Sequence, residues 1–211
     1  MTRVKICGLV RPEDARFADS AGADYLGVVF APSPRRRTEE QAGRIWKGTA
    51  AGRAGVFLDS SVEDVTRRAV ELDLAVVQLH GSEAPDYCKK IRDAGPWATW
   101  KAARVVDADD LSRALESYAD VADGLLLEGW SDRGHGGVGA SFEWSVAGDI
   151  RATWPEDLHL ILAGGLNADN VADAIEKLRP DVVDVSSGVE AALGIKDHEA
   201  VKAFVDAAKG R

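Results

Sequence analysis

LHLILAGGLNADNVADAIEKLRPDVVDVSSGVEAALGIKD, residues 158–197, is the stretch that decides the fold. It contains two short apolar runs, at residues 158–163 and 182–185, and each run ends in small residues. The segment between the runs has a helical pattern, with Asn167 as its expected N-cap and apolar residues recurring on one face. The stretch therefore predicts a strand, a glycine turn, a helix, a second strand and a second glycine turn.

The small residues that follow the two apolar runs can bind an anion. Gly164 and Gly165 follow the first run, and Ser186, Ser187 and Gly188 follow the second. Glycine turns let backbone N–H groups approach an anion, and a helix N-terminus adds about half a positive charge. The last two strands of a (β/α)8 barrel commonly bind phosphate in this way. We therefore predict a phosphate site here; the alternative is that the glycines serve only as tight turns.

Apolar, strand-like runs recur along the whole chain, with helical patterns between them. None alternates cleanly between apolar and polar residues, and continuous apolar runs between helices are typical of buried parallel strands. At 211 residues the chain has the length of one barrel, and no linker or change of composition divides it. We predict a single (β/α)8-barrel domain over residues 1–211. The eight runs span residues 4–7, 25–30, 55–58, 75–79, 99–102, 124–127, 158–163 and 182–186.

Helix-start signals lie between these runs. Thr38-x-x-Gln41 and Ser60-x-x-Glu63 resemble capping boxes, in which side chains satisfy the first N–H groups of a helix. A last helix is expected over residues 197–209. The order of these signals supports alternating strands and helices.

The composition argues against two classes of partner. A formal net charge of −9 disfavours binding to a nucleic-acid backbone. No apolar run approaches the ~20 residues that span a bilayer, and the polar start MTRVKICG is not a signal peptide. Cys7 and Cys88 lack metal-ligand spacing and suggest a reduced, cytoplasmic protein. An excess of arginine over lysine with many acidic residues is typical both of salt adaptation and of a GC-rich genome.

Polar residues occupy inward-facing positions near the ends of several predicted strands. In such a barrel the chemistry lies at the carboxyl ends of the strands, and residues two apart point the same way. Because the apolar face of each strand must meet the helices, the polar face points into the barrel. A buried unpaired polar group costs about 1–3 kcal/mol, so such a ring suits a polar ligand better than a structural core. The residues are Lys5, Cys7, Gln78, His80, Lys101, Glu128, Asp184 and Ser186.

Short motifs that occur in order along the chain resemble those of the phosphoribosylanthranilate isomerase family, (β/α)8 enzymes of tryptophan biosynthesis. Each motif alone is weak evidence for this family, but the motifs together, at the ends of the predicted strands, are highly specific for it. The resemblance runs over about residues 4–204. The motifs are KICG at 5–8, SPR at 33–35, QLHG at 78–81, GGVG at 136–139 followed by Phe142 and Trp144, LAGGLN at 162–167, DVSSGVE at 184–190 and GIKD at 194–197.

The resemblance implies an Amadori rearrangement. The aminoaldose N-(5-phosphoribosyl)anthranilate becomes the aminoketose 1-(2-carboxyphenylamino)-1-deoxyribulose 5-phosphate. An acid must protonate the furanose oxygen so that the ring opens to a Schiff base, and a base must then remove the proton from C2′. The iminium of the substrate serves as the electron sink, so the resemblance implies no metal and no organic cofactor. The implied partner is this small phosphosugar-anthranilate substrate.

The resemblance assigns the general base to Cys7. A free thiol has a pKa of about 8.5 and is mostly protonated at neutral pH. Lys5 on the same strand face, together with the cationic iminium, could favour the thiolate. The alternative is that Cys7 is only a small buried apolar residue.

The general acid is where the chain departs from the family. The family pattern ends the sixth strand in Leu-Leu-Asp, whereas here Leu126 and Leu127 are followed by Glu128. A glutamate can transfer the same proton, but its extra methylene moves the carboxyl, and misplacement by ~1 Å can cost about 100-fold in rate. Asp132 in the following loop is a rival acid, and a solvated strand-end charge at Glu128 is a further alternative.

The resemblance also implies the substrate contacts. Arg35 matches the anchor of the anthranilate carboxylate, for which a guanidinium fork is suited, although a shift to the adjacent Arg36 stays open. His80 is expected to contact the substrate or to support a residue that does. Asp184 is expected to contact the ribose hydroxyls or the anthranilate amine, or to pair with a lysine. His135 receives no role.

Two other interpretations stay open. One is another phosphate-binding barrel enzyme of the same pathway, such as indole-glycerol-phosphate synthase or the tryptophan synthase α subunit, which would not be expected to carry KICG with Cys7 as base. The other is a non-catalytic phosphosugar-binding protein derived from the isomerase, which the substitution at Glu128 permits. The sequence does not decide between a monomer and a homodimer, nor whether the histidine-pathway aminoaldose is accepted.

Overall fold

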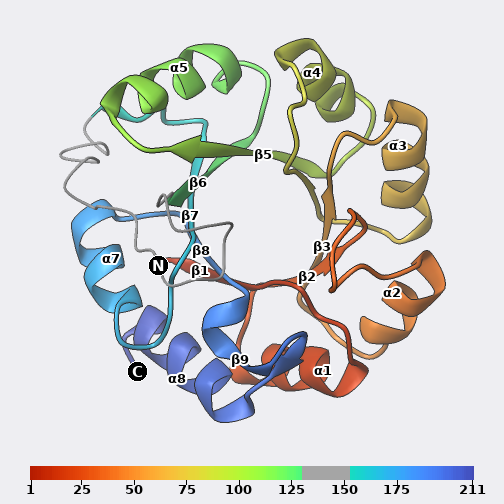
Figure 1. Ribbon diagram of the computed structural model, residues 1–211, viewed down its shortest axis with the longest axis vertical. Coiled ribbons are helices and arrows are strands. Elements are labelled where there is room, and N and C mark those ends of the chain that lie inside the picture. Colours follow the sequence, from red (N-terminus) through yellow and green to blue (C-terminus); the bar gives the residue numbers. More distant parts are fainter. Residues whose placement is uncertain (130–152) are drawn as a thin grey trace.

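The structure, a computed structural model, describes residues 1–129 and 153–211. Eight parallel strands form a closed barrel, and helices surround it (Figure 1). Each strand pairs with the next along the chain, and the eighth pairs with the first to close the ring. The predicted (β/α)8 fold is therefore confirmed. The strands are β1 (Arg3–Ile6), β2 (Tyr25–Val29), β3 (Gly52–Phe57), β4 (Val76–Leu79), β5 (Ala98–Val105), β6 (Gly124–Gly129), β7 (His159–Ala163) and β8 (Val182–Val185).

Helices connect the strands, and side-chain caps fix where several of them begin. Thr38 and Gln41 form the predicted capping box, with each side chain bonded to the backbone of the other residue. Asp197 caps the last helix by accepting from two backbone N–H groups. The described helices are α1 (Pro12–Ala21), α2 (Glu39–Ile45), α3 (Val62–Glu71), α4 (Pro85–Asp93), α5 (Ala108–Tyr118), α7 (Val171–Leu178), α8 (His198–Lys209) and the 3-10 helix η1 (Ser187–Val189).

Two predicted helix starts were wrong. The N-cap of α3 is Ser61 rather than Ser60, and its hydroxyl accepts from the N–H of Asp64. The N-cap of α7 is Asn170 rather than Asn167, because a separate turn precedes the helix. In that turn the side chain of Asn167 accepts from the N–H of Asn170. Both predictions chose the wrong one of two nearby polar residues.

Two apolar layers hold the barrel together. The outer layer lies between the sheet and the helices. The inner layer fills the barrel around Trp100, which is fully buried. At the amino-terminal end of the barrel, a guanidinium nitrogen of Arg3 donates to the hydroxyl of Tyr25 at 2.6 Å, and another lies 3.3 Å from Nε2 of His159. The inner layer consists of Ala54, Val76, Trp100, Leu126, Ile161, Ala163 and Val182.

The inward orientation predicted for Lys101 was wrong. Its neighbour Trp100 takes the inward position on β5, so Lys101 points outward, toward the helices. There its ammonium donates to the carbonyl oxygen of Gly81 at 2.7 Å and lies 3.2 Å from a carboxylate oxygen of Glu83. It also lies 5.6 Å from the ring centroid of Tyr118 in α5. This lysine is thus a buried structural cation.

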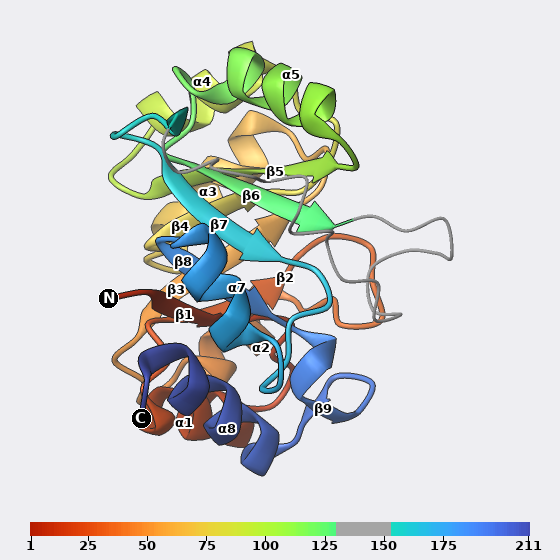
Figure 2. The same cartoon turned by 90° about the vertical axis from the view of Figure 1, so that its left-hand side faces the viewer.

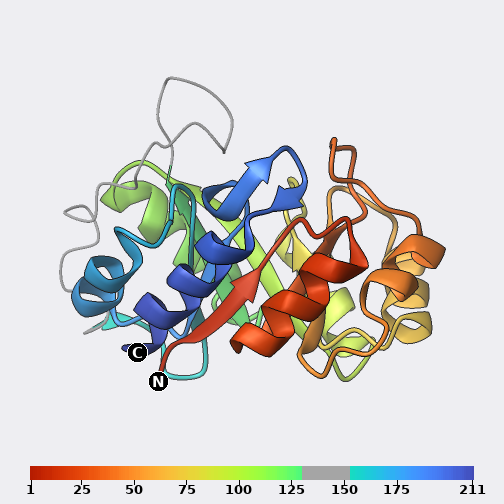
Figure 3. The same ribbon diagram turned by 90° about the horizontal axis from the view of Figure 1, so that it is seen from below.

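The two ends of the barrel differ. After η1, strands β9 (Glu190–Ala192) and β10 (Ile195–Lys196) form an antiparallel hairpin. The hairpin lies at the end toward which the strands point, whereas both chain termini lie at the other end (Figure 2; Figure 3). Across residues 1–129 and 153–211, we find no helix with the length and apolar character needed to cross a membrane.

Candidate active site

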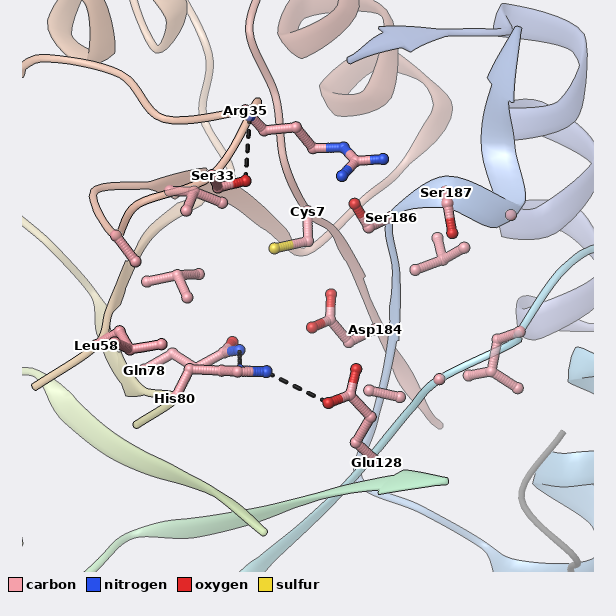
Figure 4. A pocket seen from close by; sticks show the side chains of 18 of the residues that line it. Cys7, Ser33, Arg35, Leu58, Gln78, His80, Glu128, Asp184, Ser186 and Ser187 are labelled. Atoms are coloured by element: carbon pink, nitrogen blue, oxygen red, sulfur yellow. Dashed lines mark hydrogen bonds and ion pairs between the residues drawn. The ribbon is translucent and has the colours of Figure 1, made fainter. Parts of the chain in front are cut away.

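A cavity of about 260 Å³ opens at the carboxyl ends of the strands. Side chains carried by several strands point into it, and the turns after β7 and β8 form one wall (Figure 4). The cavity brings together the residues that the sequence assigns to catalysis, to substrate binding and to phosphate binding. They are Cys7, Arg35, His80, Glu128, Gly164, Gly165, Asp184, Ser186, Ser187 and Gly188.

The two glycine turns approach each other closely. Gly164 and Gly165 have φ angles of 85° and 69°, which glycine adopts without strain. A Cβ on Gly188 would lie 1.9 Å from the carbonyl oxygen of Leu166, so the contact between the turns requires glycine. Helix η1 begins at Ser187, and the first N–H groups of a helix have no partner within it. This wall can therefore present N–H groups to an anion.

Cys7 follows β1 directly and faces the cavity, with 8% of its surface exposed. Burial raises the pKa of its thiol, and the neighbouring ammonium of Lys5 offsets this only in part. The expectation that Lys5 favours the thiolate is thus outweighed by burial. A Cβ on Gly27 in β2 would lie 2.9 Å from Sγ of Cys7 and 3.2 Å from Cε of Lys5. Glycine at this position makes room for both side chains.

Lys5 is fully buried and joins two strands across the barrel. Its ammonium donates to Oδ2 of Asp184 and to Oε1 of Gln78, each at 2.8 Å. Burial alone would lower the pKa of Lys5, but the attraction of Asp184 and Cys7 outweighs it and raises the pKa. Within the described part of the chain, Oδ1 of Asp184 is buried and has no hydrogen-bond partner. Because Asp184 lines the cavity, this oxygen is the candidate acceptor for a ligand there.

Glu128 lies near the carboxyl end of β6 and points toward His80 (Figure 4). Nε2 of His80 lies 3.4 Å from Oε2 of Glu128, and its Nδ1 lies 3.0 Å from Nε2 of Gln78. The interaction with His80 lowers the pKa of Glu128, and burial, which acts in the opposite direction, does not reverse this. Cys7 lies on the opposite side of the cavity, with Asp184 between the two groups (Figure 4).

Arg35 reaches the cavity from the loop after β2, and a residue of the β9–β10 hairpin binds its guanidinium. Its Nε and Nη2 donate to the two carboxylate oxygens of Glu190 at 2.7 and 2.6 Å. The buried ammonium of Lys196 donates to the same carboxylate at 3.0 Å and to the carbonyl oxygen of Ser186 at 2.9 Å. A Cβ on Gly8, the glycine of KICG, would lie 2.7 Å from Cδ of Arg35. These contacts connect the arginine to the turn after β8.

A third wall of the cavity is apolar. Leu58 lies at its mouth with 41% of its surface exposed, whereas Ala31 and Val56 are buried. A surface of this kind suits a flat apolar ring. The apolar residues are Val29, Ala31, Pro32, Val56 and Leu58.

Several residues considered in the sequence lie outside the described residues. They are the rival acid Asp132, His135, the GGVG motif at 136–139 and the following Phe142 and Trp144. Within residues 1–129 and 153–211, no three histidine, cysteine, aspartate or glutamate side chains converge in a way that could hold a metal ion.

The sequence interpretation missed three residues that shape the cavity. Glu190 and Lys196 fall inside the DVSSGVE and GIKD motifs, but their partner Arg35 lies far away in the sequence. Gly27 interrupts the apolar run of β2, and an isolated glycine in a strand is typical of a close approach. That signal could have found Gly27.

Comparisons with known proteins agree on one family. The sequence profile described as N-(5'phosphoribosyl)anthranilate (PRA) isomerase matches residues 4–207. The N-(5'-phosphoribosyl)anthranilate isomerase of Chromohalobacter salexigens is 45% identical over 207 residues, which cover 97% of this chain and 92% of that protein. The crystal structure of phosphoribosyl anthranilate isomerase from Thermotoga maritima is 41% identical, with a TM-score of 0.90 and full coverage of both chains. A complex of the same enzyme type with reduced 1-(o-carboxyphenylamino)-1-deoxyribulose 5-phosphate is 39% identical, with a TM-score of 0.87 and full coverage.

Proposed function

The chain belongs to the N-(5'-phosphoribosyl)anthranilate isomerase family, and we propose that it converts N-(5-phosphoribosyl)anthranilate to 1-(2-carboxyphenylamino)-1-deoxyribulose 5-phosphate with Cys7 as base and Glu128 as acid. The reaction is the isomerisation step of tryptophan biosynthesis. One observation carries the assignment of roles. A thiol and a carboxyl face each other across a single cavity, and the two glycine turns form one of its walls (Figure 4).

The first step opens the sugar ring. Glu128 gives a proton to the furanose oxygen while the bond between that oxygen and C1′ breaks, and the lone pair of the anthranilate nitrogen forms the iminium. The unpaired oxygen of Asp184 is available to accept a hydrogen bond from the anthranilate N–H or from a ribose hydroxyl. Its other oxygen is held by Lys5, so the position of the acceptor is fixed before the substrate arrives.

The second step moves the hydrogen. Cys7, as the thiolate, removes the proton from C2′, and the electron pair flows into the iminium to form an enolamine. Ketonisation then places a proton on C1′ and releases the proton of the C2′ hydroxyl, which balances the isomerisation. The electron sink is part of the substrate, so these protein groups need only position it and move protons.

The ends of the substrate have separate anchors in this proposal. The phosphate binds at the N–H groups of Gly164, Gly165, Ser187 and Gly188. The anthranilate carboxylate binds Arg35. Glu190 takes the Nε–Nη2 edge of that guanidinium, so the end formed by the two Nη atoms is the part that can receive the substrate.

The apolar wall that ends in Leu58 receives the anthranilate ring. One domain over residues 1–211 and a cytoplasmic location fit this role, and both cysteines are free thiols.

Anthranilate fluorescence tests the function. Freshly prepared phosphoribosylanthranilate is mixed with the purified chain, and the product is identified by its co-migration with the authentic aminoketose. Turnover supports the isomerase. Tight binding of the reduced aminoketose phosphate without turnover supports the non-catalytic binding protein that the substitution at Glu128 permits. If the chain shows neither binding nor turnover, both the isomerase and the non-catalytic binding protein are overturned.

A further inference from the structure

Four side chains, Lys5, Gln78, His80 and Glu128, form one continuous line of contacts that ends at the proposed acid. The ammonium of Lys5 lies 2.8 Å from Oε1 of Gln78, and Nε2 of Gln78 lies 3.0 Å from Nδ1 of His80. Nε2 of His80 lies 3.4 Å from Oε2 of Glu128. Lys5 and Gln78 have no direct role in the proposed chemistry. Their arrangement nevertheless determines which atom of Glu128 carries a proton.

Lys5 determines which groups donate and which accept along this line of contacts. An ammonium has only donors, so the atom of Gln78 that faces it must be the amide oxygen. The amide nitrogen of Gln78 then faces His80 and can only donate. Because Lys5 is also bound by Asp184 and is fully buried, the amide cannot turn over without placing two donors against each other.

The same argument determines the tautomer of the His80 ring. An amide N–H that points at Nδ1 requires a lone pair on Nδ1, so the neutral ring carries its hydrogen on Nε2. That nitrogen lies 3.4 Å from Oε2 of Glu128, so Oε2 is the oxygen that the ring N–H faces. When Glu128 is protonated, its proton is therefore placed on Oε1, because a proton on Oε2 would meet the ring N–H. Oε1 is the oxygen that points away from His80 and into the cavity (Figure 4).

We propose that Gln78 and His80 are positioning residues that hold the acidic proton of Glu128 on the oxygen facing the substrate. The inference rests on the proposed function of Glu128 as general acid. With the opposite tautomer, the lone pair on Nε2 would attract the proton to Oε2, and Glu128 would donate to His80 instead of to the furanose oxygen. A merely structural histidine would work equally well in either tautomer.

Nitrogen-15 NMR of the imidazole rings tests the tautomer directly. The chain has 4 histidines, and His80→Gln identifies the resonances of His80 by their loss. We expect a neutral ring with hydrogen on Nε2 in the wild-type protein. In Gln78→Leu the ring should become a mixture of tautomers, because the donor to Nδ1 is gone. A wild-type ring with hydrogen on Nδ1 would overturn the inference.

Kinetics test the consequence for the acid. Gln78→Leu and His80→Leu should each lower kcat by about tenfold or more, because a carboxyl misdirected by ~1 Å loses up to about 100-fold. His80→Gln places an amide N–H where Nε2–H was and should restore most of kcat. KM and the dissociation constant of the reduced aminoketose phosphate should change little, since its anchors lie elsewhere. A kcat within twofold of wild type in both leucine variants, or no rescue by glutamine, would overturn the positioning role.

The two arms separate this inference from the proposed function. The NMR measurement needs no substrate, so it decides the tautomer even if the wild-type protein proves inactive. An inactive wild-type protein would overturn the function. An active wild type with unaffected leucine variants would overturn only the role of Gln78 and His80.

Discussion

The guanidinium of Arg35 and the carboxylate of Glu190 meet edge to edge, with two parallel contacts of 2.7 and 2.6 Å. Paired in this way, the arginine is aimed before any substrate carboxylate arrives, and less side-chain entropy is lost on binding. Lys196 also donates to the carboxylate of Glu190. The proposed carboxylate anchor therefore depends on residues of the β9–β10 hairpin as well as on Arg35 itself.

Arg35→Gln should raise KM by about tenfold with a smaller effect on kcat, because a charged hydrogen bond common to substrate and transition state is lost. Glu190→Gln should raise KM by less, since the guanidinium remains but is no longer aimed. The matched control is Arg36→Gln. Arg36 is exposed and lines a different surface hollow, so this variant should behave like the wild type. A larger effect at Arg36 than at Arg35 would move the anchor by one position.

Cys7→Ser should abolish turnover and leave binding of the reduced aminoketose phosphate nearly unchanged. A hydroxyl of similar volume cannot act as the base near neutral pH. Steady-state assays and calorimetric titration measure the two quantities. Near-wild-type activity of the serine variant would remove Cys7 from the mechanism. Cys88→Ser is the control, because Cys88 lies on the buried face of α4 and does not line the cavity.

Glu128→Gln should lower kcat by about 100-fold or more, because the amide keeps the shape of the side chain but has no transferable proton. Glu128→Asp should retain partial activity, since the shorter side chain draws back from His80. Asp132→Asn should leave kcat nearly unchanged. An active Glu128→Gln variant together with an inactive Asp132→Asn variant would assign the acid to Asp132.

Gly165→Val should raise KM strongly. The φ of 69° disfavours any side chain, and a β-branched one would block the approach of phosphate to the turn. Gly43→Ala is the contrasting change, because α2 has open space around Gly43. It should leave KM unchanged and stabilise the fold by roughly 0.5–1 kcal/mol, measured by denaturant unfolding. An unchanged KM in Gly165→Val would place the phosphate elsewhere.

The pH profile of kcat/KM should be flat across neutrality. As pH rises the thiolate fraction of Cys7 increases while the protonated fraction of Glu128 decreases, and between the two pKa values these changes cancel. His80 lowers the pKa of Glu128 and burial raises the pKa of Cys7, so the plateau should be broad. Below the first pKa thiolate is lost without gain of acid, and above the second the acid is lost without gain of thiolate. A narrow bell centred near neutral pH would contradict this assignment.

The sequence predicted the barrel well because each strand is a local signal, an apolar run followed by a turn. The inward orientation of Cys7, Asp184 and Glu128 followed from simple alternation. Lys101 was misplaced because its apolar neighbour Trp100 fills the interior of the barrel, so the polar residue of the pair points outward.

Contacts between distant residues could not be predicted from local patterns. The bond between Arg35 and Glu190 and the contact between His80 and Glu128 depend on how the closed sheet brings separate strands together. The glycine at position 27 is a different case. As an isolated glycine in a strand it was a local signal of a close approach, but only the packed structure reveals that Cys7 and Lys5 are the side chains that approach it.

The filled interior of the barrel determines how substrate enters the cavity and how product leaves it. The inner layer around Trp100, and Arg3 bonded to Tyr25 beneath it, occupy the far end of the barrel, so the cavity has its doorway at the carboxyl end. In the part of the chain that the structure describes, this opening is the route by which the aminoaldose enters and the aminoketose leaves. Both carry the same phosphate and carboxylate, so each departing product vacates both anchors before the next substrate can use either.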